Sequence, residues 1–119
     1  MSRVVHFEIA SDDPSKAVKF YSETFGWKFQ KWDGPQEYWL ISTGPEGQPG
    51  INGGLLRGQR PTVNTIDVPD IDATLATVTS NGGKICMPKF AIAGVGQVAY
   101  CEDPEGNMFG VLQADALVR

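Results

Sequence analysis

The first hydrophobic pattern in the chain alternates with period two. Val5, Phe7 and Ile9 are apolar, whereas His6 and Glu8 between them are polar. Successive side chains of a β-strand point to opposite faces, so this alternation predicts a strand with one apolar face. We expect the apolar face to meet a helix. His6 and Glu8 then lie together on the other face.

The period changes to that of a helix after this strand. The apolar side chains recur at helical spacing, and Gly26 follows as a stop signal. Either Ser11 or Asp13 can cap the start, and Pro14 suits a first helical turn. We expect three aromatic residues of this apolar stripe to lie in the core; they are Phe20, Tyr21 and Phe25.

The remaining segments complete two similar sets of elements. Turn residues separate short strand-like runs, and an apolar stripe on Ile71, Leu75 and Val78 predicts a second helix, capped by Asp70 or Asp72. The expected strands of the first half are 27–32, 38–43 and 51–56, and those of the second half are 63–68, 84–87, 97–102 and 107–113. Each half therefore reads βαβββ.

The two halves also match residue by residue at an offset of 57 positions. The offset pairs Gly26 with Gly83 and Gly53 with Gly110, and it pairs the histidine of the first strand with a valine. We interpret residues 1–119 as a single domain with half-modules 1–57 and 61–119. Two like modules commonly share a site, so we expect functional residues where corresponding strands converge.

Composition excludes several classes of partner. Ten basic and fourteen acidic residues give a net charge of −4, with no basic cluster to attract nucleic acid or an anionic membrane. No apolar run approaches the ~20 residues that span a bilayer. We expect Cys86 and Cys101 to be buried free thiols of a cytoplasmic protein, since both lie in apolar runs and no signal peptide is evident.

Several of these motifs together resemble the vicinal-oxygen-chelate superfamily, which includes glyoxalase I, bleomycin-resistance proteins and extradiol dioxygenases. They are a histidine in the first strand, Phe20-Tyr21 and Phe25-Gly26-Trp27 at the end of the first helix, and Glu102-Asp103-Pro104-Glu105-Gly106-Asn107 near the end of the chain. The resemblance implies an α+β fold in which two βαβββ modules form a curled eight-stranded mixed sheet around a central cavity. It also implies a homodimer.

The resemblance implies metal ligands on the first, fourth, fifth and eighth strands of metal-dependent relatives. The matching positions here are His6, a residue near Gly53, Val63 and Gly110, and only the first can ligate. A catalytic metal needs about three protein ligands. We therefore expect no metal and no other cofactor, although Glu8 or Asp67 could supply ligands in a rearranged site.

The leading hypothesis is a glyoxalase-like protein that binds a small organic molecule between its modules. His6 and Glu8 are the candidate catalytic residues, because a lone imidazole and a nearby carboxylate can move protons. His6 is also a candidate ligand contact; the others are Tyr38, Trp39, Thr65 and Tyr100. Two alternatives stay open: a lyase or isomerase that moves a proton beside a carbonyl, and a metal-dependent glyoxalase or dioxygenase.

Overall fold

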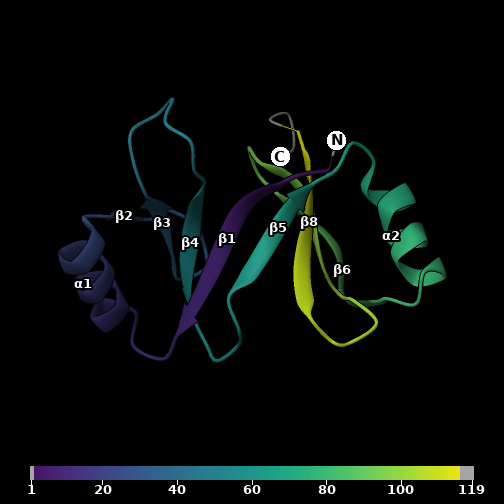
Figure 1. The fold of residues 1–119 in the computed structure, drawn as a ribbon, viewed down its shortest axis with the longest axis horizontal. Coiled ribbons are helices and arrows are strands. Elements are labelled where there is room, and N and C mark those ends of the chain that lie inside the picture. Colours follow the sequence, from purple (N-terminus) through teal and green to yellow (C-terminus); the bar gives the residue numbers. More distant parts are fainter. Residues whose placement is uncertain (1, 116–119) are drawn as a thin grey trace. The chain divides into compact units, whose positions relative to one another are not determined.

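The computed structural model describes residues 2–115 and has the expected α+β composition. Eight strands and two helices follow one another as two βαβββ modules, so the predicted fold class is confirmed (Figure 1). The strands form an eight-stranded mixed sheet, with the hydrogen-bonded order β2-β3-β4-β1 in the first module and β5-β8-β7-β6 in the second. The chain divides into two compact units at residues 5/6 and 62/63, and each is described by itself below.

The first unit, residues 6–62, contains most of β1 and the four elements after it. Its elements are β1 (Val4–Ser11), α1 (Pro14–Phe25), β2 (Lys28–Lys31), β3 (Tyr38–Ser42) and β4 (Asn52–Arg57). β4 pairs with β1 in parallel and with β3 antiparallel, and β2 forms the edge. The parallel pairing places β1 beside β4, which brings the polar face of β1 next to residues from the end of the module.

The second unit contains residues from 63 onward together with the start of the chain. Its elements are β5 (Val63–Asp67), α2 (Ile71–Ser80), β6 (Lys84–Ile92), β7 (Gly96–Glu102) and β8 (Met108–Ala114). β5 pairs with β8 in parallel, and β7 lies between β8 and β6 with antiparallel pairing to both. This arrangement repeats that of the first unit, which explains the offset in the sequence.

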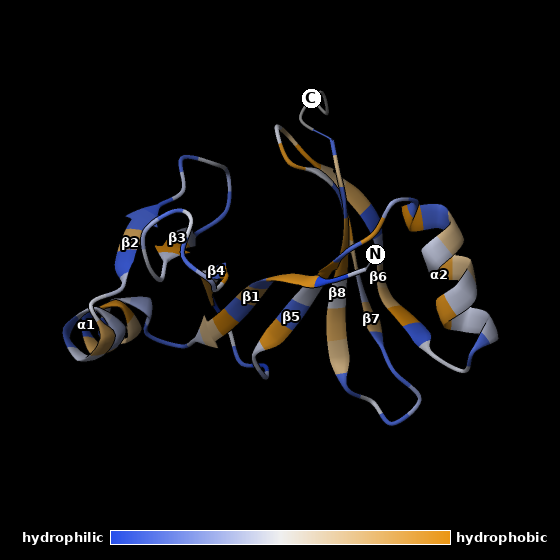
Figure 2. Ribbon diagram, turned by 45° about the horizontal axis from the view of Figure 1, so that its top comes forward, coloured by the Kyte–Doolittle hydropathy of each residue, from blue (hydrophilic) through white to orange (hydrophobic). Residues whose placement is uncertain are grey.

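Apolar positions of each unit lie on the face of its strands that meets its helix. In the second unit Ile71 and Leu75 of α2 pack with Ala99, Cys101 and Val111. In the first unit the buried positions include Ile41 of β3 and Leu55 of β4. Figure 2 shows the resulting alternation of hydrophobic and hydrophilic residues along β1 and β5.

The two helices begin and end with the expected local signals. Asp13, rather than Ser11, caps α1 by accepting a hydrogen bond from the Lys16 amide, and Asp70, rather than Asp72, caps α2. Gly26 ends α1 in the left-handed conformation, with φ of 74°, and its amide donates to the Ser22 carbonyl.

The prediction that the aromatic residues of α1 are core residues is wrong for two of the three. Phe20 and Phe25 are 55% and 60% exposed, and Tyr21 is half-buried. The rings pack against one another and against Trp27, with Tyr21 and Trp27 stacked at 5.1 Å between centroids. Helical periodicity identifies which side chains share a face, but it does not say how much of that face the strands cover.

The prediction that both cysteines are buried holds only for Cys101. Cys101 belongs to the core of the second unit, whereas Cys86 is exposed; both are free thiols. Cys86 lies at an irregularity of β6, where the pairing with β7 shifts between Ile85 and Met87. β6 is an edge strand, and an extra residue at an edge bulge has no buried position to occupy.

No helix in residues 2–115 is long and apolar enough to cross a membrane. The predicted cavity between the modules stays a prediction.

Candidate functional site

The polar face of β1 carries a three-residue hydrogen-bond cluster in the first unit. The Tyr38 hydroxyl donates to Glu8 Oε2 at 2.9 Å, and the same hydroxyl oxygen lies 3.0 Å from His6 Nε2. His6 and Glu8 share one face because they are two residues apart on a strand, and Tyr38 reaches them from β3 across β4. The structure thus brings together three of the residues predicted from sequence.

Arg60 adds a positive charge to this cluster. Its Nη2 donates to Glu8 Oε1 at 2.6 Å, and the two side chains are 23% and 10% exposed. Buried carboxylates need compensation by a charge or by hydrogen bonds, and Glu8 has both. The sequence prediction missed Arg60, because it lies in the polar connection between modules and reaches a strand 52 residues earlier. The residues beside it, Gln59 and Pro61, form no pattern that would indicate a contact with Glu8.

Gly54 makes room for the tyrosine. It pairs with Glu8 across β1 and β4, and a Cβ atom at this position would overlap the phenol end of Tyr38. The sequence comparison placed the relatives' fourth-strand ligand near Gly53, but a Cβ there would meet Phe7 on the apolar face. On the face of His6 and Glu8, the paired residues of β4 are therefore Asn52 beside His6 and Gly54 beside Glu8.

Burial favours the neutral form of the His6 ring. Burial lowers the pKa of His6 below its usual 6.5, and the charge of Glu8 offsets only part of this effect. In its neutral form the imidazole can accept a proton or a hydrogen bond from a ligand.

In the second unit a glycine of β8 also lies beside two of the predicted contact residues. Gly110 pairs with Thr65 on β5 and with Tyr100 on β7, and a Cβ atom on Gly110 would lie 3.2 Å from Thr65 Oγ1 and 3.5 Å from the Tyr100 ring. The Tyr100 ring stacks on Phe90 at 6.3 Å between centroids. Two further predicted residues thus lie together here, around a glycine that corresponds to Gly54 in the first unit.

Trp39, another predicted contact, lies on the opposite face of β3 from Tyr38. Adjacent strand residues face opposite sides of a sheet, and Trp39 pairs with Leu55 on the face that carries the buried Ile41. The Lys31 ammonium lies 5.5 Å from the centre of its ring. Trp39 therefore belongs to the packed side of β3.

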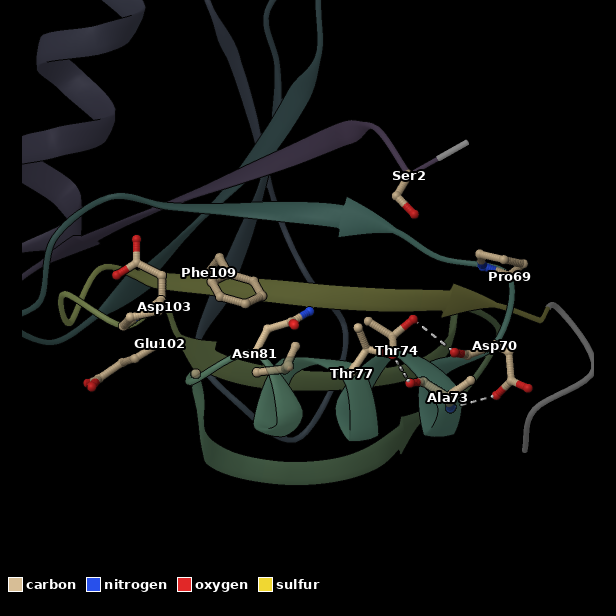
Figure 3. Close-up of a pocket in the computed structure, with 13 residues that line it drawn as sticks. Ser2, Pro69, Asp70, Ala73, Thr74, Thr77, Asn81, Glu102, Asp103 and Phe109 are labelled. Atoms are coloured by element: carbon tan, nitrogen blue, oxygen red, sulfur yellow. Dashed lines mark hydrogen bonds between the residues drawn. The ribbon is translucent and has the colours of Figure 1, made fainter.

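A groove along α2 and another in the loop between β3 and β4 contain no predicted site residue. The first, of about 500 Å³, lies along α2 and is lined by Asp70, Thr74, Asn81 and Phe109 among others (Figure 3). Its lining is mostly apolar, and the Asp70 side chain there caps the helix. The second groove, of about 480 Å³, lies in the loop between β3 and β4.

The cluster contains two side chains that could ligate a metal, His6 and Glu8. Within residues 2–115, no group of three or more histidine, cysteine, aspartate or glutamate side chains is placed to hold a metal ion. Glu8 binds Arg60 and Tyr38 through its two oxygens, and His6 Nε2 faces the Tyr38 hydroxyl. This donor set does not match the three ligands that a catalytic transition metal requires.

Residues 3–111 match the family described as the Glyoxalase/Bleomycin resistance protein/Dioxygenase superfamily. The chain belongs to this superfamily. CFP32 of Mycobacterium tuberculosis, which carries a provisional glyoxylase name, is 32% identical over 117 residues that cover 91% of this chain and 44% of that protein. A glyoxylase-like domain-containing protein of Didymella fabae is also 32% identical, over 87% of this chain and 88% of its own length.

The superfamily fold is also evident in solved structures. A variant of methylmalonyl-CoA epimerase from Streptomyces coelicolor, in complex with 2-nitronate-propionyl-CoA, superposes with a TM-score of 0.72 at 16% identity. The match covers 98% of this chain and 97% of the epimerase. At this identity the likeness shows the fold alone. The chain spans less than half the length of the mycobacterial relative.

Proposed function

We propose that this superfamily member binds a small organic molecule at the cluster of His6, Glu8, Tyr38 and Arg60, without a divalent metal. The observation that carries the proposal is the Tyr38 hydroxyl, which lies within hydrogen-bond distance of both His6 Nε2 and Glu8 Oε2. In this arrangement a phenol connects the imidazole and the carboxylate. Thr65 and Tyr100, which lie together in the second unit, stay predicted ligand contacts.

The ligand that fits such a cluster is small and polar at one end. Arg60 supplies positive charge, and the neutral His6 ring can accept a hydrogen bond, so a carbonyl compound that also carries a hydroxyl group would match both. Aromatic side chains of the modules favour an apolar remainder. Two-carbon and three-carbon oxoaldehydes, their thiol adducts and acyl-CoA thioesters are therefore the first compounds to test.

A thermal-shift screen of the full chain tests the proposal. A ligand that binds only the folded protein raises the melting temperature as its concentration passes the dissociation constant. We expect hits among these compounds, with at least a tenfold weaker affinity in His6→Ala and in Tyr38→Phe. Tyr21→Phe is the matched control, since it removes a phenol hydroxyl from α1 of the same unit and should leave affinity unchanged.

Two results would contradict the proposal. One is a hit whose affinity is unchanged by both cluster variants. The other is a stoichiometric metal in protein purified without chelators that disappears in His6→Ala, which would establish the metal-dependent alternative instead.

A second candidate function, a lyase or isomerase, is favoured by the neutral His6 beside Glu8. In such a reaction the imidazole takes a proton from the carbon next to a carbonyl, which leaves an enolate and an imidazolium, and the proton then returns to the enolate at a new position or face. Incubation of a bound carbonyl compound in deuterium oxide detects this step as deuterium at that carbon. Binding without exchange would restrict the protein to a binding role.

We also propose that the chain forms a homodimer and works in the cytoplasm. The unpaired edges of β2 and β6 and the exposed aromatic rings of α1 are surfaces that association would cover. Sedimentation equilibrium of the purified chain tests the dimer, and a monomer at all concentrations would contradict it.

A further inference from the structure

We infer that Tyr38 is a positioning residue that keeps the proton of the neutral His6 ring on Nε2 and so makes Nδ1 the basic atom of the site. The inference deepens the function proposed above, because it specifies which ring atom meets the ligand. The position of the ring proton does not depend on the proposed function. Only the use of the basic nitrogen in binding or proton transfer does. The proton positions themselves follow from the donors and acceptors in the cluster.

Arg60, Glu8 and Tyr38 are joined by hydrogen bonds whose donors and acceptors can be assigned one after another, beginning at Arg60. A guanidinium has donors and no acceptor, and it donates to Glu8 Oε1 at 2.6 Å. An ionised carboxylate has acceptors and no donor, so Glu8 Oε2 must accept from the Tyr38 hydroxyl at 2.9 Å. Each step therefore fixes the role of the next group.

The Tyr38 hydroxyl then determines whether the His6 ring nitrogen beside it donates or accepts. A phenol has one proton, and Tyr38 uses it on Glu8. Its oxygen can then only accept from the ring nitrogen 3.0 Å away, so His6 Nε2 must carry hydrogen. In the neutral ring the other nitrogen, Nδ1, has the free lone pair. The hydrogen bond made by one ring nitrogen sets which of the two nitrogens carries the proton.

The opposite assignment is disfavoured by charge. It would require a proton on Glu8, so that Glu8 donates to Tyr38 and Tyr38 donates to His6 Nε2. A proton on Glu8 would cancel its charge next to a guanidinium that lies 2.6 Å away in a largely buried pair. Removing one charge from such a pair leaves the other without compensation. Arg60 therefore sets the direction of the whole chain.

The inference specifies the ligand chemistry more closely. Nδ1 can accept but not donate, so the ligand should present a proton to it, either from a hydroxyl group or from a carbon made acidic by an adjacent carbonyl. If that proton transfers, the resulting imidazolium is stabilised by Glu8 through the Tyr38 hydroxyl. Hydroxy-carbonyl compounds meet this requirement, and simple ethers or tertiary amides do not.

Nitrogen-15 NMR of the ligand-free protein tests the inference directly. His6 is the only histidine, so the ring signals need no assignment. In a neutral imidazole the protonated nitrogen resonates far upfield of the unprotonated one, and coupling to the carbon-bound ring protons distinguishes Nε2 from Nδ1. We expect the wild type to be at least nine-tenths in the Nε2–H form at alkaline pH.

Three variants identify what holds the tautomer. Tyr38→Phe removes the phenol, and Glu8→Gln replaces an obligate acceptor by an amide that can also donate, so both should raise the Nδ1–H form at least threefold. Tyr21→Phe should leave the ratio unchanged. A wild-type ring in the Nδ1–H form would overturn the inference, and so would a ratio that neither cluster variant alters. Because no ligand is present, a failed ligand screen would count against the proposed function and not against this result.

Discussion

The phenol end of Tyr38 occupies the space that a side chain on Gly54 would need. A Cβ atom built on Gly54 overlaps the Tyr38 hydroxyl and ring, well inside van der Waals contact. Only glycine at this position of β4 therefore allows a tyrosine from β3 to reach across to Glu8 and His6. The absence of a side chain on Gly54 therefore creates the room for the hydroxyl that joins the cluster.

Gly54→Ala is expected to destabilise the protein by about 1–3 kcal/mol, because an added methyl group in a packed site forces side chains to move. Urea unfolding measures this change. Gly44→Ala is the control: its added Cβ would lie 3.6 Å from the nearest atom of Gln48, an ordinary contact, so its effect should stay within about 0.5 kcal/mol. In a Tyr38→Ala background the cost of Gly54→Ala should largely vanish. An equal cost in both backgrounds would contradict the overlap.

The stability of the protein should fall as the pH is lowered through the unfolded pKa of His6. Burial lowers the pKa of the folded ring below 6.5 despite the opposite effect of Glu8, so the unfolded state binds this proton at a higher pH than the folded state. The contribution of His6 is therefore complete above that value and is lost as the pH falls toward the folded pKa.

The measurement compares the wild type with His6→Gln, which has no ring to protonate. Unfolding free energies at about pH 8 and about pH 5.5 should show a larger decrease for the wild type than for the variant. Since His6 is the only histidine, no other imidazole confuses the difference. A wild type that gains stability relative to the variant on acidification would mean that the Glu8 charge outweighs burial.

The sequence was sufficient for those features that depend on local periodicity. The alternation of β1 placed His6 and Glu8 on one face, and the helix caps and stops defined α1 and α2 within a few residues. Alternation alone could not say whether Tyr38 or Trp39 joins them, because neighbouring residues of a strand face opposite ways and the register of β3 is a tertiary property. The structure selects Tyr38.

Long-range pairing explains the remaining differences. Arg60 contacts Glu8 across 52 residues of sequence, and no pattern near Arg60 indicates that contact. The alignment of halves at a constant offset suggested Gly53, whereas the strand pairing makes Gly54 the counterpart of Gly110, a shift of one residue that changes the face. A comparison of sequences does not detect such a shift, but in a sheet the shift determines which face a side chain occupies.

Truncating the smaller side chain, Ile71 of α2, should reduce the stability more than truncating the larger one, Phe25 of α1. Ile71 of α2 is 1% exposed and lies in the core, so Ile71→Ala should cost about 2–5 kcal/mol. Phe25 of α1 is 60% exposed, so Phe25→Ala should cost less than about 1 kcal/mol, although a buried phenylalanine would cost about 3–5 kcal/mol. Urea denaturation of both variants measures the contrast. A larger loss for Phe25→Ala in the monomeric protein would show that α1 is packed as the sequence suggested.

Two arginine–glutamate pairs of similar length should contribute very differently to stability. Arg60 and Glu8 lie 2.6 Å apart with side chains 23% and 10% exposed, whereas Arg57 and Glu37 lie 2.7 Å apart with side chains 57% and 37% exposed. Removing one member of a buried pair leaves an uncompensated charge, at a cost of about 3–5 kcal/mol when burial is complete, while solvent screens an exposed pair. Because Arg60 retains some contact with water, we expect Arg60→Met to cost on the order of 2 kcal/mol.

Arg57→Met is the matched control, since methionine keeps most of the aliphatic stem at either position. It should destabilise the protein much less than Arg60→Met, and raising the salt concentration should weaken the Arg57 contribution more than that of Arg60. Urea unfolding at low and high salt measures both effects. Adding Glu8→Gln to Arg60→Met should recover part of the lost stability, because the buried charge is then removed together with its partner. Equal losses for the two arginine variants, or no recovery in the double variant, would mean that Glu8 does not depend on Arg60 for compensation.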